Sequence, residues 1–203
     1  MTLIQKVIQD QLADYKIVIV PHTELSNKIM EARKEFQQKY EIEIPITSRP
    51  DITLVTYKQS PISEQRIINH LKPIAMAAPA FKVEVKDYGS FPSHTIFLNV
   101  PTKIPIESIR NKIRAEAGRF MKVDNDTKPH FLNDFNFTLA RKLKPWQYEK
   151  AWLEYSHRHF TGRFIADRML FLRKRKSEYK YQILESFQFE NLAIESKQGE
   201  LFG

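Results

Sequence analysis

The chain has 203 residues, 42% of them hydrophobic, and a formal net charge of +8. This length lies at the upper end of one domain and supplies a sizeable core, so we expect a single domain over residues 1–203. The lack of cysteine excludes disulfides and thiolate metal sites, and no apolar run reaches membrane-spanning length. Residues 1–10 also lack the apolar core of a signal peptide. We therefore expect a cytoplasmic monomer without membrane contact.

The first half of the chain predicts alternating strands and helices. A β-branched run closed by proline is typical of a buried strand, and apolar residues at helical spacing indicate an amphipathic helix. The expected elements are a strand at 15–21, a helix from Ser26 as N-cap to about Tyr40, a strand at 51–57 and a helix from Pro61 to near Pro79.

The second half predicts two ribbons and two more helices. Proline favours the first position of a helix, and glycine with aspartate marks turns. The expected elements are strands at 81–85 and 94–100 around a turn at 87–90, a helix opened by Pro105, a strand at 135–143, a helix opened by Pro145, strands at 164–172 and 179–189 around a basic turn at 173–176, and a frayed tail at 194–203.

This order of elements favours an α+β fold. Hairpins interrupt the alternation of helices and strands, so mixed or antiparallel sheets covered by helices are expected rather than a doubly wound sheet. The two halves also echo each other, because the strands at 51–57 and 135–143 are each followed by a proline-opened helix and a two-stranded ribbon. Two similar lobes are therefore predicted.

The strongest local signal is a short repeat. Asp51-Ile52-Thr53-Leu54 and Asn136-Phe137-Thr138-Leu139 share a polar residue, an apolar one, a threonine and a leucine. Since alternate side chains of a strand share a face, each threonine lies on the same face as the polar residue two positions before it. If the two strands lie close together, four hydrogen-bonding groups form one small site.

With this repeat, the chain resembles the two-histidine (2H) phosphoesterase superfamily, specifically the bacterial 2'-5' RNA ligase-like proteins, from about Tyr15 to Phe189. Val20-Pro21 at the end of the first strand, Thr138-Leu139-Ala140-Arg141 and the apolar strand 95–100 support the resemblance. It implies a bilobal fold in which two sheets surround a central cleft, with helices outside. It also implies that a His-x-Thr/Ser motif from each lobe lines the cleft.

This sequence differs from the family motif at the catalytic positions. Asp51 and Asn136 stand where the family has its histidines. In the family, one imidazole is thought to accept a proton and the other to donate one, while the two threonines hold the phosphate. Histidine suits both roles because its pKa is about 6.5. Asparagine does not titrate, and a free aspartate has a pKa of about 3.9.

Further residues are candidates for the same site. We interpret Asp51, Thr53, Asn136 and Thr138 as the degenerate catalytic set, and expect ligand contacts from Arg141, Tyr57, His94 and His130. Asp51 with the threonine hydroxyls offers oxygen ligands for Mg²⁺, but one carboxylate is too little, and we expect no metal and no cofactor. Twelve Lys or Arg against four acids between 141 and 180 indicate either attraction of a polyanion or a solvated basic face.

Three functions are consistent with these observations. The first is a pseudoenzyme that binds an RNA end or nucleotide through its phosphate without turnover. The second is an active cyclic phosphodiesterase or 2'-5' RNA ligase with Asp51 as base and a lysine, His94 or His130 as acid. The third is a protein-interaction domain that keeps the motif strands for packing. Whether the chain is an enzyme stays open at this point.

Overall fold

A computed structural model of the chain describes residues 12–43, 46–123 and 127–192. The frayed tail expected at 194–203 lies outside the described residues, as do residues 1–11. The first half contains β1 (Ala13–Ile19), α2 (Thr23–Lys39), β2 (Ile52–Gln59), a 3-10 turn (Pro61–Ser63), α3 (Glu64–Ala77), β3 (Phe81–Lys86), β4 (Tyr88–Phe91) and β5 (Thr95–Asn99). The second half contains α4 (Ile104–Glu116), a 3-10 turn (Gly118–Met121), β6 (His130–Phe131), β7 (Asn136–Arg141), α5 (Pro145–Tyr155), β8 (Thr161–Ala166), β9 (Arg168–Lys174) and β10 (Gln182–Gln188).

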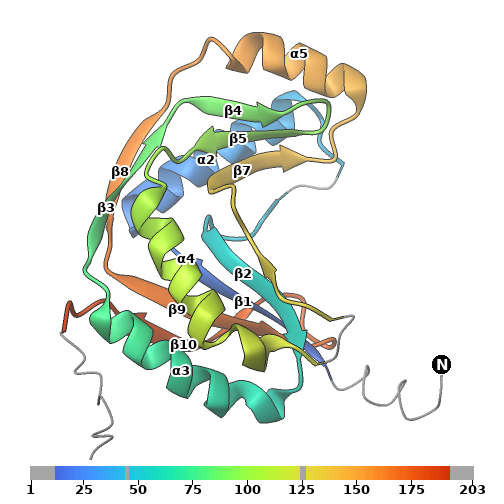
Figure 1. The fold of residues 1–203 in the computed structure, drawn as a ribbon. Coiled ribbons are helices and arrows are strands. Elements are labelled where there is room, and N and C mark those ends of the chain that lie inside the picture. Colours follow the sequence, from blue (N-terminus) through green and yellow to red (C-terminus); the bar gives the residue numbers. More distant parts are fainter. Residues whose placement is uncertain (1–11, 44–45, 124–126, 193–203) are drawn as a thin grey trace, which may run out of the picture.

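The strands of the described residues form three antiparallel groups. The β1 sheet has the order β10-β9-β1-β2-β6, the β5 sheet has the order β4-β5-β7, and β3 pairs with β8 alone. In Figure 1 the β5 sheet lies at the top, the β1 sheet at the bottom, and the β3–β8 pair runs between them on the left. The predicted α+β class with antiparallel sheets is confirmed. None of the described helices is both long and apolar enough to cross a membrane.

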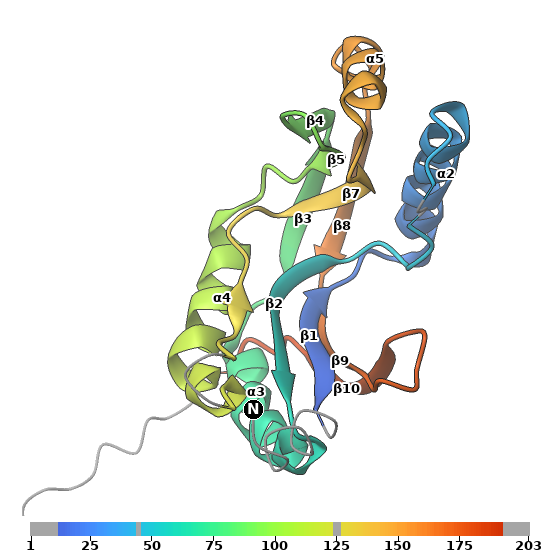
Figure 2. The ribbon, with the colours of Figure 1, turned by 90° about the vertical axis from the view of Figure 1, so that its right-hand side faces the viewer.

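The two sheets are built by two repeats that exchange parts. The first repeat contains β1, α2 and β2 and continues to β4, and the second contains β5, α4 and β7 and continues to β9. Strand β4 of the first repeat joins the β5 sheet, and strand β9 of the second repeat joins the β1 sheet. The helices cross over in the same way, because α2 packs against β7 and β8 while α4 packs against β2 and α3. Figure 2 shows α2 and α4 on opposite sides of the motif strands β2 and β7.

The sequence repeat is also a repeat of backbone geometry. In β2, Thr53 and Val55 pair with consecutive residues of β1, so Leu54 is the extra residue of a β-bulge. In β7, Thr138 and Ala140 pair with consecutive residues of β5, so Leu139 is the extra residue there. Both motif strands therefore bulge at the leucine that follows the motif threonine.

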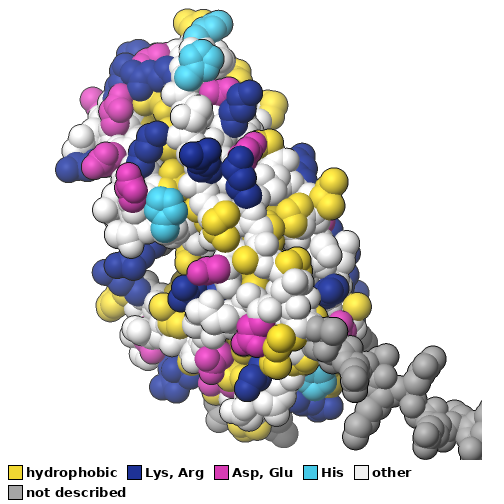
Figure 3. Space-filling model, turned by 90° about the vertical axis from the view of Figure 1, so that its left-hand side faces the viewer, with side chains coloured by type: hydrophobic (Ala, Val, Ile, Leu, Met, Phe, Trp, Pro, Cys, Tyr) yellow, Lys and Arg dark blue, Asp and Glu magenta, His cyan; other side chains and the backbone are white. Residues whose placement is uncertain are grey.

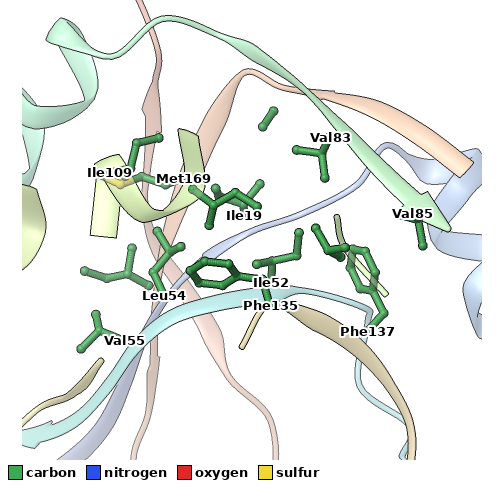
Figure 4. Close-up of a cluster of buried hydrophobic side chains, with 14 of the residues drawn as sticks. Ile19, Ile52, Leu54, Val55, Val83, Val85, Ile109, Phe135, Phe137 and Met169 are labelled. Carbon is green, nitrogen blue, oxygen red and sulfur yellow. The ribbon is translucent and has the colours of Figure 1, made fainter. Parts of the chain in front are cut away.

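The apolar residue of each motif lies in the shared core. Ile52 and Phe137 are buried, and Figure 4 shows both in one cluster with Val83 of β3 and Phe135. Burial of such side chains contributes roughly 1.5–3 kcal/mol each. Because side chains alternate along a strand, Asp51 and Thr53, like Asn136 and Thr138, point away from this cluster. Their half-buried state agrees with that orientation.

The expected hairpin of residues 81–85 and 94–100 is wrong. Residues 87–90, which we expected to form the turn of this hairpin, belong mostly to strand β4. Strand β4 pairs with β5, while β3 pairs with β8. Asp87, with a φ of 57°, separates β3 from β4, and Asp167 separates β8 from β9 in the same way, so the strand expected at 164–172 is two strands. Each aspartate marks the point where the chain passes from one sheet to another.

Helix capping explains where two helices begin relative to the sequence prediction. Helix α2 begins at Thr23 because the His22 side chain caps it, its Nδ1 accepting a hydrogen bond from the Leu25 amide at 3.3 Å. The expected start at Ser26 is therefore one turn late. Helix α5 begins at Pro145 as predicted.

A buried arginine occupies the same place in each repeat. Arg33 of α2 and Arg110 of α4 are only 5% and 7% exposed. Arg110 donates to the Leu132 carbonyl at 2.9 Å and to the Asn133 side chain, just before β7. Arg33 donates to the Ser48 carbonyl at 2.6 Å, just before β2. Each guanidinium thus fixes the approach to a motif strand.

We expect Arg110→Met to lower the free energy of unfolding by about 1.5–3 kcal/mol, because it removes the hydrogen bonds that this charged side chain donates to Leu132 and Asn133. The matched control is Lys112→Met on the exposed side of α4, with a change within about 0.5 kcal/mol. Urea unfolding measures both. Equal losses would show that Arg110 contributes no more than a surface cation.

Candidate functional site

The polar residues of the first motif are joined to a lysine of the neighbouring strand. Thr53 Oγ1 donates to Asp51 Oδ1 at 2.7 Å. Lys16 Nζ of β1 forms an ion pair with Asp51 Oδ2, and both side chains are only 14% exposed. Lys16 was not predicted as a site residue, because in the sequence it is one polar position within an apolar strand. Its contact with Asp51 depends on the pairing of β1 with β2.

The second motif has no such partner. Thr138 Oγ1 donates to Asn136 Oδ1 at 3.2 Å, which repeats the threonine-to-motif hydrogen bond of β2. Among the described residues, neither side chain forms a hydrogen bond with a titratable group. The amide nitrogen of Asn136 keeps its two donors for a ligand. The two motifs are thus alike in backbone and different in charge.

Arg33 connects the two motif strands. Besides the Ser48 carbonyl before β2, its Nε donates to the Thr138 carbonyl within β7 at 3.1 Å. Burial lowers the pKa of Arg33, Asp51 opposes this shift, and the positive charge of Arg141 adds to it. Arg33 therefore lies close enough to sense both Asp51 and Arg141, which places a cation between the motifs. The spacing of α2 gave no sign that this arginine is buried.

Tyr181 covers the Lys16–Asp51 pair. The Lys16 ammonium lies 4.9 Å from the centroid of the Tyr181 ring, a distance typical of a cation–π contact. The pKa of Tyr181 is raised, first by burial and then by the charges of Asp14 and Asp51. Tyr181 was not predicted either, because it lies in the connection before β10, far from the motif in sequence.

Among the described residues, neither candidate histidine forms a side-chain hydrogen bond with a motif residue. His130 is exposed and pairs with Thr56 on the edge of the β1 sheet, further along β2 than Asp51 and Thr53. His94 is exposed in the turn before β5, where its Nδ1 lies 2.6 Å from Thr95 Oγ1. Antiparallel pairing puts His94 at the Arg141 end of β7, opposite the Asn136 end. Arg141 itself is exposed at the end of β7.

The interpretation of Tyr57 as a ligand-binding residue is wrong. Its side chain is 5% exposed and its ring stacks on Tyr15 at 5.2 Å, in the core. The bulge at Leu54 changes the alternation along β2, so Tyr57 does not share the face of Thr53. Burial raises its pKa well above the usual value. Tyr57 cannot stack a base there.

The basic turn at 173–176 is less available than expected. Arg173 lies at the end of β9 and pairs with Glu64 of α3 at 2.9 Å, with side chains 14% and 20% exposed. Elsewhere in the basic window, Arg158 pairs with Glu35 and Glu154, and Arg168 with Asp167. On the face shown in Figure 3, basic and acidic side chains are interspersed. The excess of Lys and Arg in sequence therefore does not become one basic patch on that face.

The arrangement does not favour a metal centre. Within the described ranges, no three His, Cys, Asp or Glu side chains gather as a metal site would require. Both oxygens of Asp51 already accept hydrogen bonds, from Thr53 and Lys16.

The fold and the repeated motif agree with the comparisons with known proteins. A family model described as the 2'-5' RNA ligase superfamily matches residues 21–178, so the chain belongs to this superfamily. Escherichia coli LigT complexed with 3'-AMP has a similar fold, with a TM-score of 0.65, 15% identity, and coverage of 88% of this chain and 98% of LigT. The protein TT0787 of Thermus thermophilus gives a TM-score of 0.61, 15% identity, and coverage of 87% and 98%. A search of curated protein sequences found no match.

We expect the Lys16–Asp51 pair to show a coupling of about 2 kcal/mol in a double-mutant cycle with Lys16→Met and Asp51→Asn. Removing one partner leaves a poorly solvated charge, and removing both does not. Urea unfolding of the four proteins measures the coupling.

The pair Lys58–Asp14 on the same two strands is the control, because its side chains are 61% and 34% exposed. Its coupling should stay below about 1 kcal/mol. If the two cycles gave the same coupling, the Lys16–Asp51 pair would be an ordinary surface contact.

Proposed function

We propose that this protein is a degenerate member of the 2'-5' RNA ligase superfamily, which binds a nucleotide or RNA end through its phosphate at the two motif strands with little or no turnover. One observation carries the proposal. The first motif presents a carboxylate engaged by Lys16, and the second presents an amide. Neither is an imidazole, the side chain whose unperturbed pKa of about 6.5 best suits acid–base catalysis near neutral pH.

The charges around the motifs suit a phosphate. Asp51 alone would repel a phosphodiester, but Lys16 balances its charge. Arg33 and Arg141 add positive charge near Asp51, since Asp51 and Arg141 both influence the pKa of Arg33. The Asn136 amide donates hydrogen bonds without adding charge. Structures of one protein with a similar fold, E. coli LigT, contain 3'-AMP, phosphate and ATP, which supports a ligand of this class.

The alternative is an active phosphodiesterase or ligase in which Asp51 is the base and Lys16 the acid. It is favoured by the contact between these two titratable groups. It is opposed by their position, because both lie at the first motif. In-line displacement at phosphorus places the attacking and leaving oxygens on opposite sides. The expectation of a cytoplasmic monomer stays a prediction.

The first test is hydrolysis of a short RNA with a 2',3'-cyclic phosphate end, with and without Mg²⁺. We expect no turnover above background from the natural chain, and measurable turnover from the double variant Asp51→His, Asn136→His, because histidine supplies the missing proton transfers at both motifs. Product is followed by chromatography.

Asp51→Ala is the control for the alternative mechanism. Turnover by the natural chain that is lost in Asp51→Ala would make Asp51 a base and overturn the proposal. If the double-histidine variant is folded and silent, and no RNA binds, the motif strands serve packing or a protein partner instead.

The second test is binding of the same RNA at two salt concentrations. Arg141→Gln should weaken binding about tenfold or more, because a charge-assisted hydrogen bond to phosphate contributes about 1.5–3 kcal/mol. Its loss should also reduce the slope of affinity against salt. Lys142→Gln is the matched control, being the next residue, exposed, and beyond the end of β7. Equal effects of the two variants would indicate nonspecific attraction.

A further inference from the structure

A pocket opens beside the second motif. It has a volume of about 460 Å³ and includes Asn136 in its lining. The rest of the lining comes from the corner between β3 and β4, from β5, and from the segments before α4 and β7. A volume of this size is within the range of small-molecule sites.

The floor of the pocket belongs to the motif face of the β5 sheet. Thr138 pairs with Phe97 and Asn136 pairs with Asn99 across β7 and β5. Directly paired residues of an antiparallel sheet share a face. Phe97 and Asn99 therefore lie on the same side as the motif residues, so a ligand held at Thr138 can extend into the pocket without leaving this surface.

Gly89 of β4 makes this floor possible. A Cβ at this position would lie 2.5 Å from a ring carbon of Phe97 and 2.4 Å from Asn99 Oδ1. Glycine thus lets both side chains lie over β4, and the ring of Phe91 lies 4.7 Å from that of Phe97. Phe91, Phe97 and Phe135 line the pocket together with Asn99 and Asn136. Aromatic rings and amides are the groups with which proteins stack and hydrogen-bond single bases.

The charges of the lining cancel. Lys86 and Lys103 face Asp87 and Asp134 around the pocket. Asp87 is already engaged, since its Oδ1 lies 3.2 Å from His159 Nδ1 and accepts from the Phe160 amide at 3.3 Å. With no net formal charge, the pocket offers little attraction to a bare phosphate. It suits a flat, uncharged, hydrogen-bonding group.

We propose that this pocket binds the base of a nucleotide whose phosphate lies at the motif strands. The inference rests on the proposed function and specifies its ligand as a nucleotide oriented with its base on the β7 side. The half-buried Phe91 stacks the base, Phe97 supports the Phe91 ring on which it packs, and the Asn99 amide contacts the edge of the base, while Asn136 stays with the phosphate.

The experiment is calorimetric titration with 3'-AMP and with inorganic phosphate. The 3'-AMP should bind about five- to hundredfold more tightly than phosphate, because this is the range of affinity that stacking of one base contributes. Phe91→Leu and Phe97→Leu should each remove most of this advantage and leave phosphate affinity unchanged. Phe91 is half-buried, so Phe91→Leu keeps the test valid if Phe97→Leu fails to fold.

The matched control is Phe81→Leu, a half-buried phenylalanine of β3 that stacks on Phe189 at 6.2 Å and lies outside the pocket. It should leave both affinities unchanged. If 3'-AMP binds no better than phosphate, or Phe91→Leu behaves like Phe81→Leu, the pocket is not a base site while phosphate binding stands. If neither ligand binds, the proposed function and this inference are both overturned.

Discussion

The pairing of β3 with β8 is the contact on which the arrangement of the lobes depends. Six residues of each strand pair in register, from Phe81 with Ala166 to Lys86 with Thr161. Beyond this ribbon, Asp87 leads one strand into the β5 sheet and Asp167 leads the other into the β1 sheet. A shift of the ribbon by one residue would turn side chains such as Val83 out of the core, so burial fixes the register.

This exchange couples the two motifs. Each motif strand lies in a sheet completed by a strand of the other repeat, and the helix of each repeat covers the other sheet. Arg33 adds a direct link, because it hydrogen-bonds the segment before β2 and the backbone of β7. The relative position of the motifs is therefore set by buried contacts. On our proposal, such rigidity suits a site that holds one phosphate between two strands.

Sequence reasoning found what local periodicity encodes. The α+β class, the proline-opened helix at Pro145 and both motif strands follow from patterns within a few residues. What it missed depends on pairing between distant segments. Lys16 reads as one polar position in an apolar strand until β1 lies beside β2, and Tyr57 reads as an accessible aromatic until the bulge at Leu54 is known. The buried Arg33 occupies a helix position where a surface residue is the ordinary expectation.

The first motif carries an aspartate and the second an asparagine at the position where the resemblance implies a histidine. This difference in charge has a physical consequence. A carboxylate that is 14% exposed is costly without a partner, so Asp51 is tolerable because Lys16 neutralises it. This pair uses the hydrogen-bonding capacity of the first motif for the protein itself. Asn136 adds no charge, needs no counterion and keeps its amide donors beside an aromatic pocket. A ligand would then gain more of its contacts from the β7 side than from the β2 side, so the near-symmetric backbone would bind its ligand asymmetrically.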